Sequence, residues 1–134
     1  MTRIAINGSK GKMGQALFEA INSSSQSEFG VGFDKGDSLT DSISNFEVLI
    51  DFSRPEASLS ALSVCKSSGK AMVIGTTGFA DSELEFIEQA SKEIPIVFAP
   101  NMSVGVNLTL KILETSAKVI GPDSSIEIIE AHRR

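Results

Sequence analysis

Short apolar runs alternate with helical patterns along the whole chain, and this alternation limits its fold more than any other feature. We predict six strands from these runs, at residues 3–7, 31–33, 47–51, 71–75, 95–99 and 125–131. The runs are nearly continuous in apolar residues, as expected where helices cover both faces of a parallel sheet. The sequence therefore predicts a doubly wound α/β domain with about six mostly parallel strands.

Helices are predicted between the strands wherever apolar residues recur at helical spacing. Pro55 is expected to open one helix that ends at Gly69, and Ser82 with Glu85 is expected to form a capping box for another that runs to about residue 92. A longer helix should end at Gly121 and present an inner face to the core. That face consists of Val106, Leu110, Leu113, Ala117 and Ile120.

Length, charge and cysteine content narrow the class of protein. A chain of 134 residues suits one domain, spanning residues 1–134, that needs no disulfide or metal site. Its 12 basic and 17 acidic residues argue against nucleic acid or an anionic membrane as partner. Cys65 is the only cysteine and is expected to pack as a small hydrophobic residue. The first residues lead directly into a strand pattern without a leader, so we expect a cytoplasmic protein.

Three glycines, Gly8, Gly11 and Gly14, lie between the first strand and the first helix. A loop at this position gives a tight turn and lets a pyrophosphate approach the backbone at a helix N-terminus. Lys10 and Lys12 add local cations to an acidic chain. The pattern favours a Rossmann-like dinucleotide-binding domain, although an ordinary turn that uses glycine for its positive φ remains the alternative.

Polar residues follow the next strands, where ligands of such sheets bind. Asp34 could accept hydrogen bonds from a ribose and Lys35 could pair with a 2′-phosphate, which predicts tolerance of both NADH and NADPH. The alternative is a solvated charged pair. After the third strand, Ser53 could cap a helix and Arg54 is either a surface cation or a ligand contact. The turns at 75–79 and 99–107 are small and polar, which suits the carboxamide of a nicotinamide.

Five motifs in this order closely resemble the 4-hydroxy-tetrahydrodipicolinate reductases, also called dihydrodipicolinate reductases. They are "GSKGKMG", "IDFSRPE", "VIGTTGF", "APNMSVGVN" and "IEIIEAHRR". The resemblance implies reduction of a cyclic imine dicarboxylate with NADPH or NADH in the diaminopimelate route to lysine. It also implies a homotetramer in the complete enzyme.

The resemblance also implies a role for individual residues. The pyrophosphate would be held by Gly8, Ser9, Lys10, Gly11, Lys12 and Met13, and the adenosine ribose by Asp34 beside Lys35. The nicotinamide side would be lined by Gly75, Thr76 and Thr77, with carboxamide contacts from Ala99, Pro100, Asn101 and Met102. His132 would donate the proton to the substrate nitrogen, and its unperturbed pKa of about 6.5 suits that task.

Two departures from the family pattern bear on activity. Arg133 replaces the family's second histidine, and the sequence stops at Arg134, before the lysine and the P-S-G-T loop with which the family binds the substrate carboxylates. We therefore expect the cofactor-binding part of a reductase, with the substrate and tetramerisation domain of the family absent after residue 134 and little turnover by this chain alone. The alternatives are a non-catalytic NAD(P)-sensing domain and another nicotinamide-dependent oxidoreductase.

Overall fold

A computed structural model describes residues 1–129 and 131. The chain divides into two compact units, Met1–Pro100 and Asn101–Arg134, which we describe separately. In the described residues the first unit holds all five strands and three of the four α-helices, and the second holds the fourth α-helix. Neither unit contains, among these residues, a helix long and apolar enough to cross a membrane.

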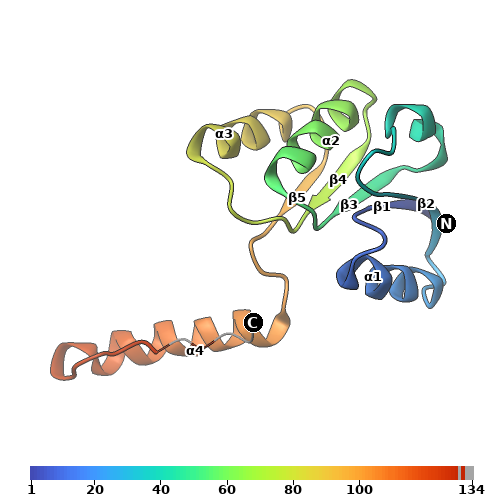
Figure 1. The fold of residues 1–134 in the computed structure, drawn as a ribbon. Coiled ribbons are helices and arrows are strands. Elements are labelled where there is room, and N and C mark those ends of the chain that lie inside the picture. Colours follow the sequence, from blue (N-terminus) through green and yellow to red (C-terminus); the bar gives the residue numbers. More distant parts are fainter. Residues whose placement is uncertain (130, 132–134) are drawn as a thin grey trace. The chain divides into compact units, whose positions relative to one another are not determined.

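The first unit is built on a parallel sheet with the strand order β2-β1-β3-β4-β5 (Figure 1). Its strands are β1 (Thr2–Asn7), β2 (Ser27–Phe33), β3 (Val48–Asp51), β4 (Ala71–Ile74) and β5 (Ile96–Phe98). The chain moves outward from β1 to β2 in one direction, and from β3 to β5 in the other. This order confirms the predicted doubly wound α/β fold, and it places the switch point between β1 and β3.

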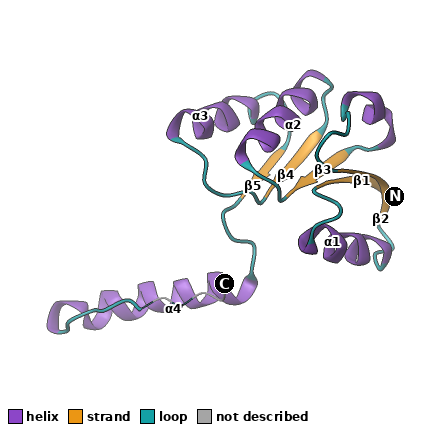
Figure 2. Ribbon diagram, in the orientation of Figure 1, coloured by secondary structure: helices purple, strands orange, loops and turns teal. Residues whose placement is uncertain are grey.

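Helices cover both faces of this sheet. Helix α1 (Lys12–Asn22) lies on one face, while α2 (Pro55–Ser67) and α3 (Asp81–Ala90) lie on the other (Figure 2). The strands are buried between these layers, which explains their apolar runs. The largest fully buried apolar side chains are those of Phe46, Ile6, Leu49, Leu62, Met72, Ile74 and Cys65.

Several predicted boundaries were wrong for reasons of local hydrogen bonding. Strand β2 begins at Ser27, opposite Thr2, because pairing with β1 extends it beyond its apolar run. Helix α3 begins after Ala80, whose backbone N–H donates to Glu83 Oε2 at 2.7 Å, so the predicted cap at Ser82 is two residues too late.

Helix α2 confirms Pro55 as a first helical residue, but Arg54 is its N-cap instead of Ser53. The helix ends at Ser67, two residues before Gly69, which has a φ of +65°. Cys65 is fully buried on this helix, as predicted for a small hydrophobic residue. Glycine at the end of the helix therefore provides the left-handed backbone that stops it.

The second unit contains helix α4 (Val104–Ile120) and a short 3₁₀ helix, η2 (Gly121–Asp123). Ser103 caps α4, because its Oγ accepts a hydrogen bond from the backbone N–H of Val106. The predicted helix is confirmed, but its predicted inner face is not buried. The sixth predicted strand is also wrong for residues 125–129 and 131, which have no strand structure. A strand needs a partner ladder, which an apolar run does not supply by itself.

Candidate functional site

A cleft of about 880 Å³ opens in the first unit at the carboxyl ends of β1, β2 and β3. This edge includes the switch point, which is where open α/β sheets bind their ligands. Its lining comes from the turns that follow the three strands and from the first turns of α2. Residues from these turns include Gly8, Asp34, Lys35, Ser53 and Arg54.

The turn after β1 is held against the end of β2. The backbone N–H groups of Gly8 and Ser9 both donate to the carbonyl oxygen of Phe33, at 2.8 and 3.1 Å. Gly8 has a φ of +84°, which favours glycine. The Gly11 N–H donates back to Gly8 O at 3.1 Å, and Gly11 is the N-cap of α1 without a capping side chain. The loop thus brings the N-terminus of α1 to the edge of the sheet.

Gly14 shows why the loop needs its third glycine. A Cβ at this position would lie 2.6 Å from Ser9 O and closer still to Gly8 O. No side chain can occupy this space while the loop and the first turn of α1 stay packed together. The three glycines therefore build an exposed helix N-terminus of the kind that binds phosphate groups, with Lys10 and Lys12 beside it.

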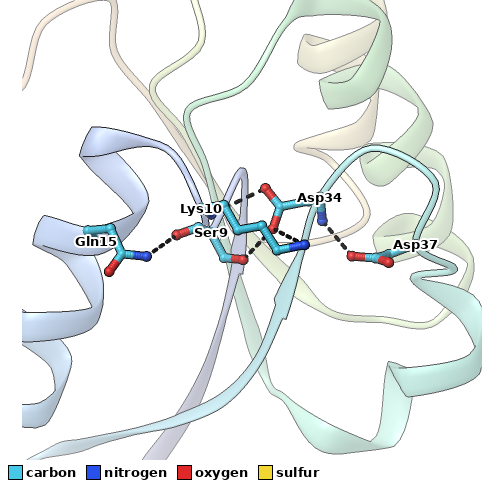
Figure 3. Close-up of polar contacts among 5 residues, drawn as sticks. All are labelled: Ser9, Lys10, Gln15, Asp34 and Asp37. Carbon is cyan, nitrogen blue, oxygen red and sulfur yellow. Dashed lines mark hydrogen bonds and ion pairs between the residues drawn. The ribbon is translucent and has the colours of Figure 1, made fainter.

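Asp34 links the end of β2 to the glycine loop. Its Oδ2 accepts a hydrogen bond from Ser9 Oγ at 2.6 Å, and its Oδ1 accepts one from the Lys10 backbone N–H at 3.2 Å (Figure 3). The Lys10 Nζ lies 4.0 Å from the same Oδ2. The carboxylate is therefore fixed at the cleft, where hydroxyl groups of a ligand could reach it.

A partly buried polar network that begins at the cleft was not predicted. Asn7 Nδ2 and the backbone N–H of Ser53 both donate to Asp51 Oδ1 at 3.1 Å. Thr76 Oγ1 accepts hydrogen bonds from the Ser53 N–H at 3.0 Å and from the Ser58 hydroxyl at 2.9 Å. Asp51 is fully buried, and its Oδ2 has no hydrogen-bond partner among the described residues. The network fixes the turn after β3 and joins it to the turn after β4.

A sequence signal for this network exists. Asn7 and Asp51 are the last residues of neighbouring strands and pair in register. A polar residue that ends an otherwise apolar strand run marks the ligand-binding edge of a parallel sheet.

The structure separates the other predicted residues into groups. Lys12 and Met13 are exposed in the first turn of α1, and Lys35 and Arg54 line the cleft. After β4, the Thr76 side chain is only 3 % exposed, whereas Thr77 is exposed. The remaining residues follow β5 or lie further along the chain. Ala99 and Pro100 belong to the first unit, Asn101 and Met102 belong to the second, and His132 lies outside the described residues.

Comparison with known protein families shows to which family this chain belongs. The profile of the family described as "Dihydrodipicolinate reductase, N-terminus" matches residues 2–102. The chain belongs to this family. The region that matches the dihydrodipicolinate reductase family contains the glycine loop, Asp34, and the turns that follow β3 and β4.

Curated relatives extend the similarity to the full length of the chain. The 4-hydroxy-tetrahydrodipicolinate reductases of Hahella chejuensis and Pseudomonas fluorescens are 43% and 46% identical to it, and each match covers 100% of the chain. The chain spans 59% of the length of each relative. A solved dihydrodipicolinate reductase from Paenisporosarcina sp. TG-14, with dipicolinate bound, superposes with a TM-score of 0.73 at 25% identity. That superposition covers 87% of this chain and 54% of the solved one.

Proposed function

We propose that this chain binds NADH or NADPH in the cleft at the carboxyl ends of β1, β2 and β3. The observation that carries the proposal is the packed glycine loop, which presents the N-terminus of α1 beside two lysines and a fixed carboxylate. These are the groups that a dinucleotide requires, because its diphosphate is anionic and its ribose carries hydroxyl donors.

Each part of the cleft then has a task in binding. The segment from Gly8 to Met13 would hold the diphosphate through backbone N–H groups, with Lys10 and Lys12 adding positive charge. Asp34 would accept hydrogen bonds from the adenosine ribose, and Lys35 would pair with the extra phosphate of NADPH. A bound reduced nicotinamide would supply a hydride to the substrate. Arg54 lines the same cleft, where it would contact the cofactor.

The nicotinamide end of the cofactor would lie near the turns that follow β4 and β5. We propose that Gly75, Thr76 and Thr77 form one side of this region. Since Thr76 is buried and bonded to the turn after β3, it would act by holding its neighbours in place. The proposed carboxamide contacts are Ala99, Pro100, Asn101 and Met102.

For the whole protein, we propose reduction of 4-hydroxy-tetrahydrodipicolinate to tetrahydrodipicolinate in the diaminopimelate route to lysine. The names of the relatives support this activity. Within it, the chain would form the cofactor-binding domain, and residues beyond the chain would supply substrate and tetramer contacts. His132 would donate a proton to the substrate nitrogen. Such an enzyme would work in the cytoplasm as a homotetramer.

Cofactor binding can be measured directly on this chain. Reduced nicotinamide is fluorescent, and it is excited near 340 nm, a wavelength at which protein side chains do not absorb. We expect a saturable change in NADH fluorescence on titration with the chain. A linear response for both NADH and NADPH would contradict the proposal.

A pair of glycine variants makes this test specific to the loop. Gly14→Ala should weaken NADH binding by about tenfold or more, since a Cβ there forces the loop away from α1. Gly121→Ala is the control, because a Cβ at that site meets no atom closer than Ile126 Cδ1 at 3.9 Å. Circular dichroism should find both variants folded. Equal binding of NADH by the two variants would show that the glycine loop is not part of the binding site.

The two alternative functions differ in what a longer protein would do. A non-catalytic sensing domain would bind the cofactor but transfer no hydride to any substrate, even in a protein of the relatives' full length. Another oxidoreductase would oxidise NADH with a different carbonyl or imine. The experiment measures cofactor oxidation at 340 nm by such a full-length protein with a panel of substrates. Its result distinguishes the sensing domain and the other oxidoreductase from the proposed reductase.

A further inference from the structure

The carboxylate of Asp34 is held unusually firmly for a group at the mouth of a cleft. Both of its oxygens accept hydrogen bonds from the glycine loop, one from the Ser9 hydroxyl at 2.6 Å and one from the Lys10 N–H at 3.2 Å (Figure 3). Its side chain is only 20% exposed. Hydrogen bonds to an ionised carboxylate are short and strong, and the Ser9 bond has the length of such a bond.

Both sides of this contact are themselves fixed. Gln15 Nε2 donates to Ser9 O at 3.0 Å, and the Asp34 backbone N–H donates to Asp37 Oδ2 at 2.8 Å (Figure 3). Gly32 makes room for the serine, because a Cβ at Gly32 would lie 2.6 Å from Ser9 Oγ. The bond between Ser9 and Asp34 is therefore part of a built structure that includes the loop, α1 and the turn after β2.

A fixed carboxylate distinguishes between the two nicotinamide cofactors. The ribose hydroxyls of NADH can donate to the lone pairs that Ser9 and Lys10 leave free, without any rearrangement of Asp34. The 2′-phosphate of NADPH would instead meet a negative charge. To relieve the repulsion, Asp34 must turn away and break its bond with Ser9. Lys35, which lines the same cleft, would then pair with the phosphate.

We propose that Ser9 sets the cofactor preference of this protein by holding Asp34 in the position that accepts a ribose and repels a 2′-phosphate. Ser9 is then a positioning residue, and the chain prefers NADH although it admits NADPH. This inference rests on the proposed binding of a nicotinamide cofactor in the cleft. It assigns the preference to the loop serine as well as to the acidic residue itself.

The test is a comparison of dissociation constants for NADH and NADPH, measured by fluorescence titration of the 134-residue chain. The wild-type chain should bind NADH more tightly. Ser9→Ala should lower the preference by about fivefold, as expected for the loss of one hydrogen bond. Ser23→Ala is the matched control, because within the described residues its hydroxyl bonds only to Glu19 O at the end of α1, and it should leave the preference unchanged.

A double-mutant cycle establishes whether Ser9 acts through Asp34. In an Asp34→Asn background, the further change Ser9→Ala should alter the preference by less than about twofold, since the charge it positions is gone. An equal effect of Ser9→Ala in both backgrounds would overturn the proposal. So would an unchanged preference in Ser9→Ala, or a wild-type preference for NADPH. If neither cofactor binds the wild-type chain, the proposed function itself fails, which is a different result.

Discussion

Helices α2 and α4 both have an apolar face at helical spacing, but only α2 has it covered. Helix α2 buries Ala61, Leu62 and Cys65 against the sheet and α3, within the first unit. Helix α4 is longer, at 17 residues, and none of its residues is buried. The comparison teaches that an apolar face predicts where a helix can be covered, but the stabilisation depends on what lies against it.

The largest effect should come from the core of the first unit. Leu62 is fully buried in α2, so Leu62→Ala should lower the free energy of unfolding by about 2–5 kcal/mol. Urea denaturation followed by circular dichroism measures this change. A loss below about 1 kcal/mol would mean that α2 is covered no better than α4.

The second effect concerns Cys65, which lies on the same buried face of α2. Burial first, and then the nearby negative charge of Asp51, raise the pKa of its thiol, which reaches about 12 although Lys70 acts to lower it. The native chain therefore contains roughly a thousandfold less thiolate than a thiol of pKa 9.0 would. Iodoacetamide at pH 8 should label Cys65 rapidly in urea and very slowly in buffer.

The same thiol makes stability depend on pH, and the sign follows from the raised pKa. Its contribution is fully present below pH 9, where the thiol is protonated in both states, and is lost as the pH rises toward 12. Urea midpoints should therefore fall above pH 9. This decline should be smaller in Cys65→Ala, and an equal decline in both proteins would assign it to other groups.

A smaller effect is expected from the matched substitution on α4. Leu110 is 56% exposed, so Leu110→Ala should change the free energy of unfolding by no more than about 0.5 kcal/mol. Urea denaturation under the conditions used for Leu62→Ala makes the two values comparable. A loss of about 2 kcal/mol or more would show that the apolar face of α4 is covered in solution.

The smallest effect concerns charges on the exposed surface of α4. Hydrogen bonds from Lys118 and then Lys111 lower the pKa of Glu114 below its ordinary value of 4.5. Because the carboxylate form is favoured in the helix, it stabilises α4 at pH values above 4.5. This contribution is lost as the pH falls through the lowered pKa of Glu114. The circular dichroism signal at 222 nm should fall slightly more below pH 4 in the wild type than in Glu114→Gln.

A control for this prediction lies in the first unit. Glu85 is exposed on α3 and forms no ion pair within the described part of the chain. Glu85→Gln should therefore keep the acid dependence of the wild type. If both variants lose it equally, the lysine contacts of Glu114 do not stabilise α4.

Much of the candidate site could be predicted because its signals are local. Gly8, Gly11 and Gly14 indicate a turn and a helix N-terminus from spacing alone, and Asp34 is found by its place after a strand. The polar network of Asp51 and Thr76 could not be predicted in the same way. Its long-range hydrogen bonds join residues that lie 18 to 44 positions apart, and no local pattern fixes which of these segments meet.

By itself, the sequence determined the alternation of strands and helices, the parallel sheet, the glycine loop, the start of α2 at Pro55 and the end of α4 before Gly121. These features follow from backbone conformation and side-chain periodicity, which act over a few residues. Only the tertiary structure decided that Ser9 holds Asp34, that Thr76 is buried and that the residues of α4 do not form a core within their own unit. Contacts between distant residues depend on how the layers pack, and the sequence of an apolar run does not specify which segment will pack against it.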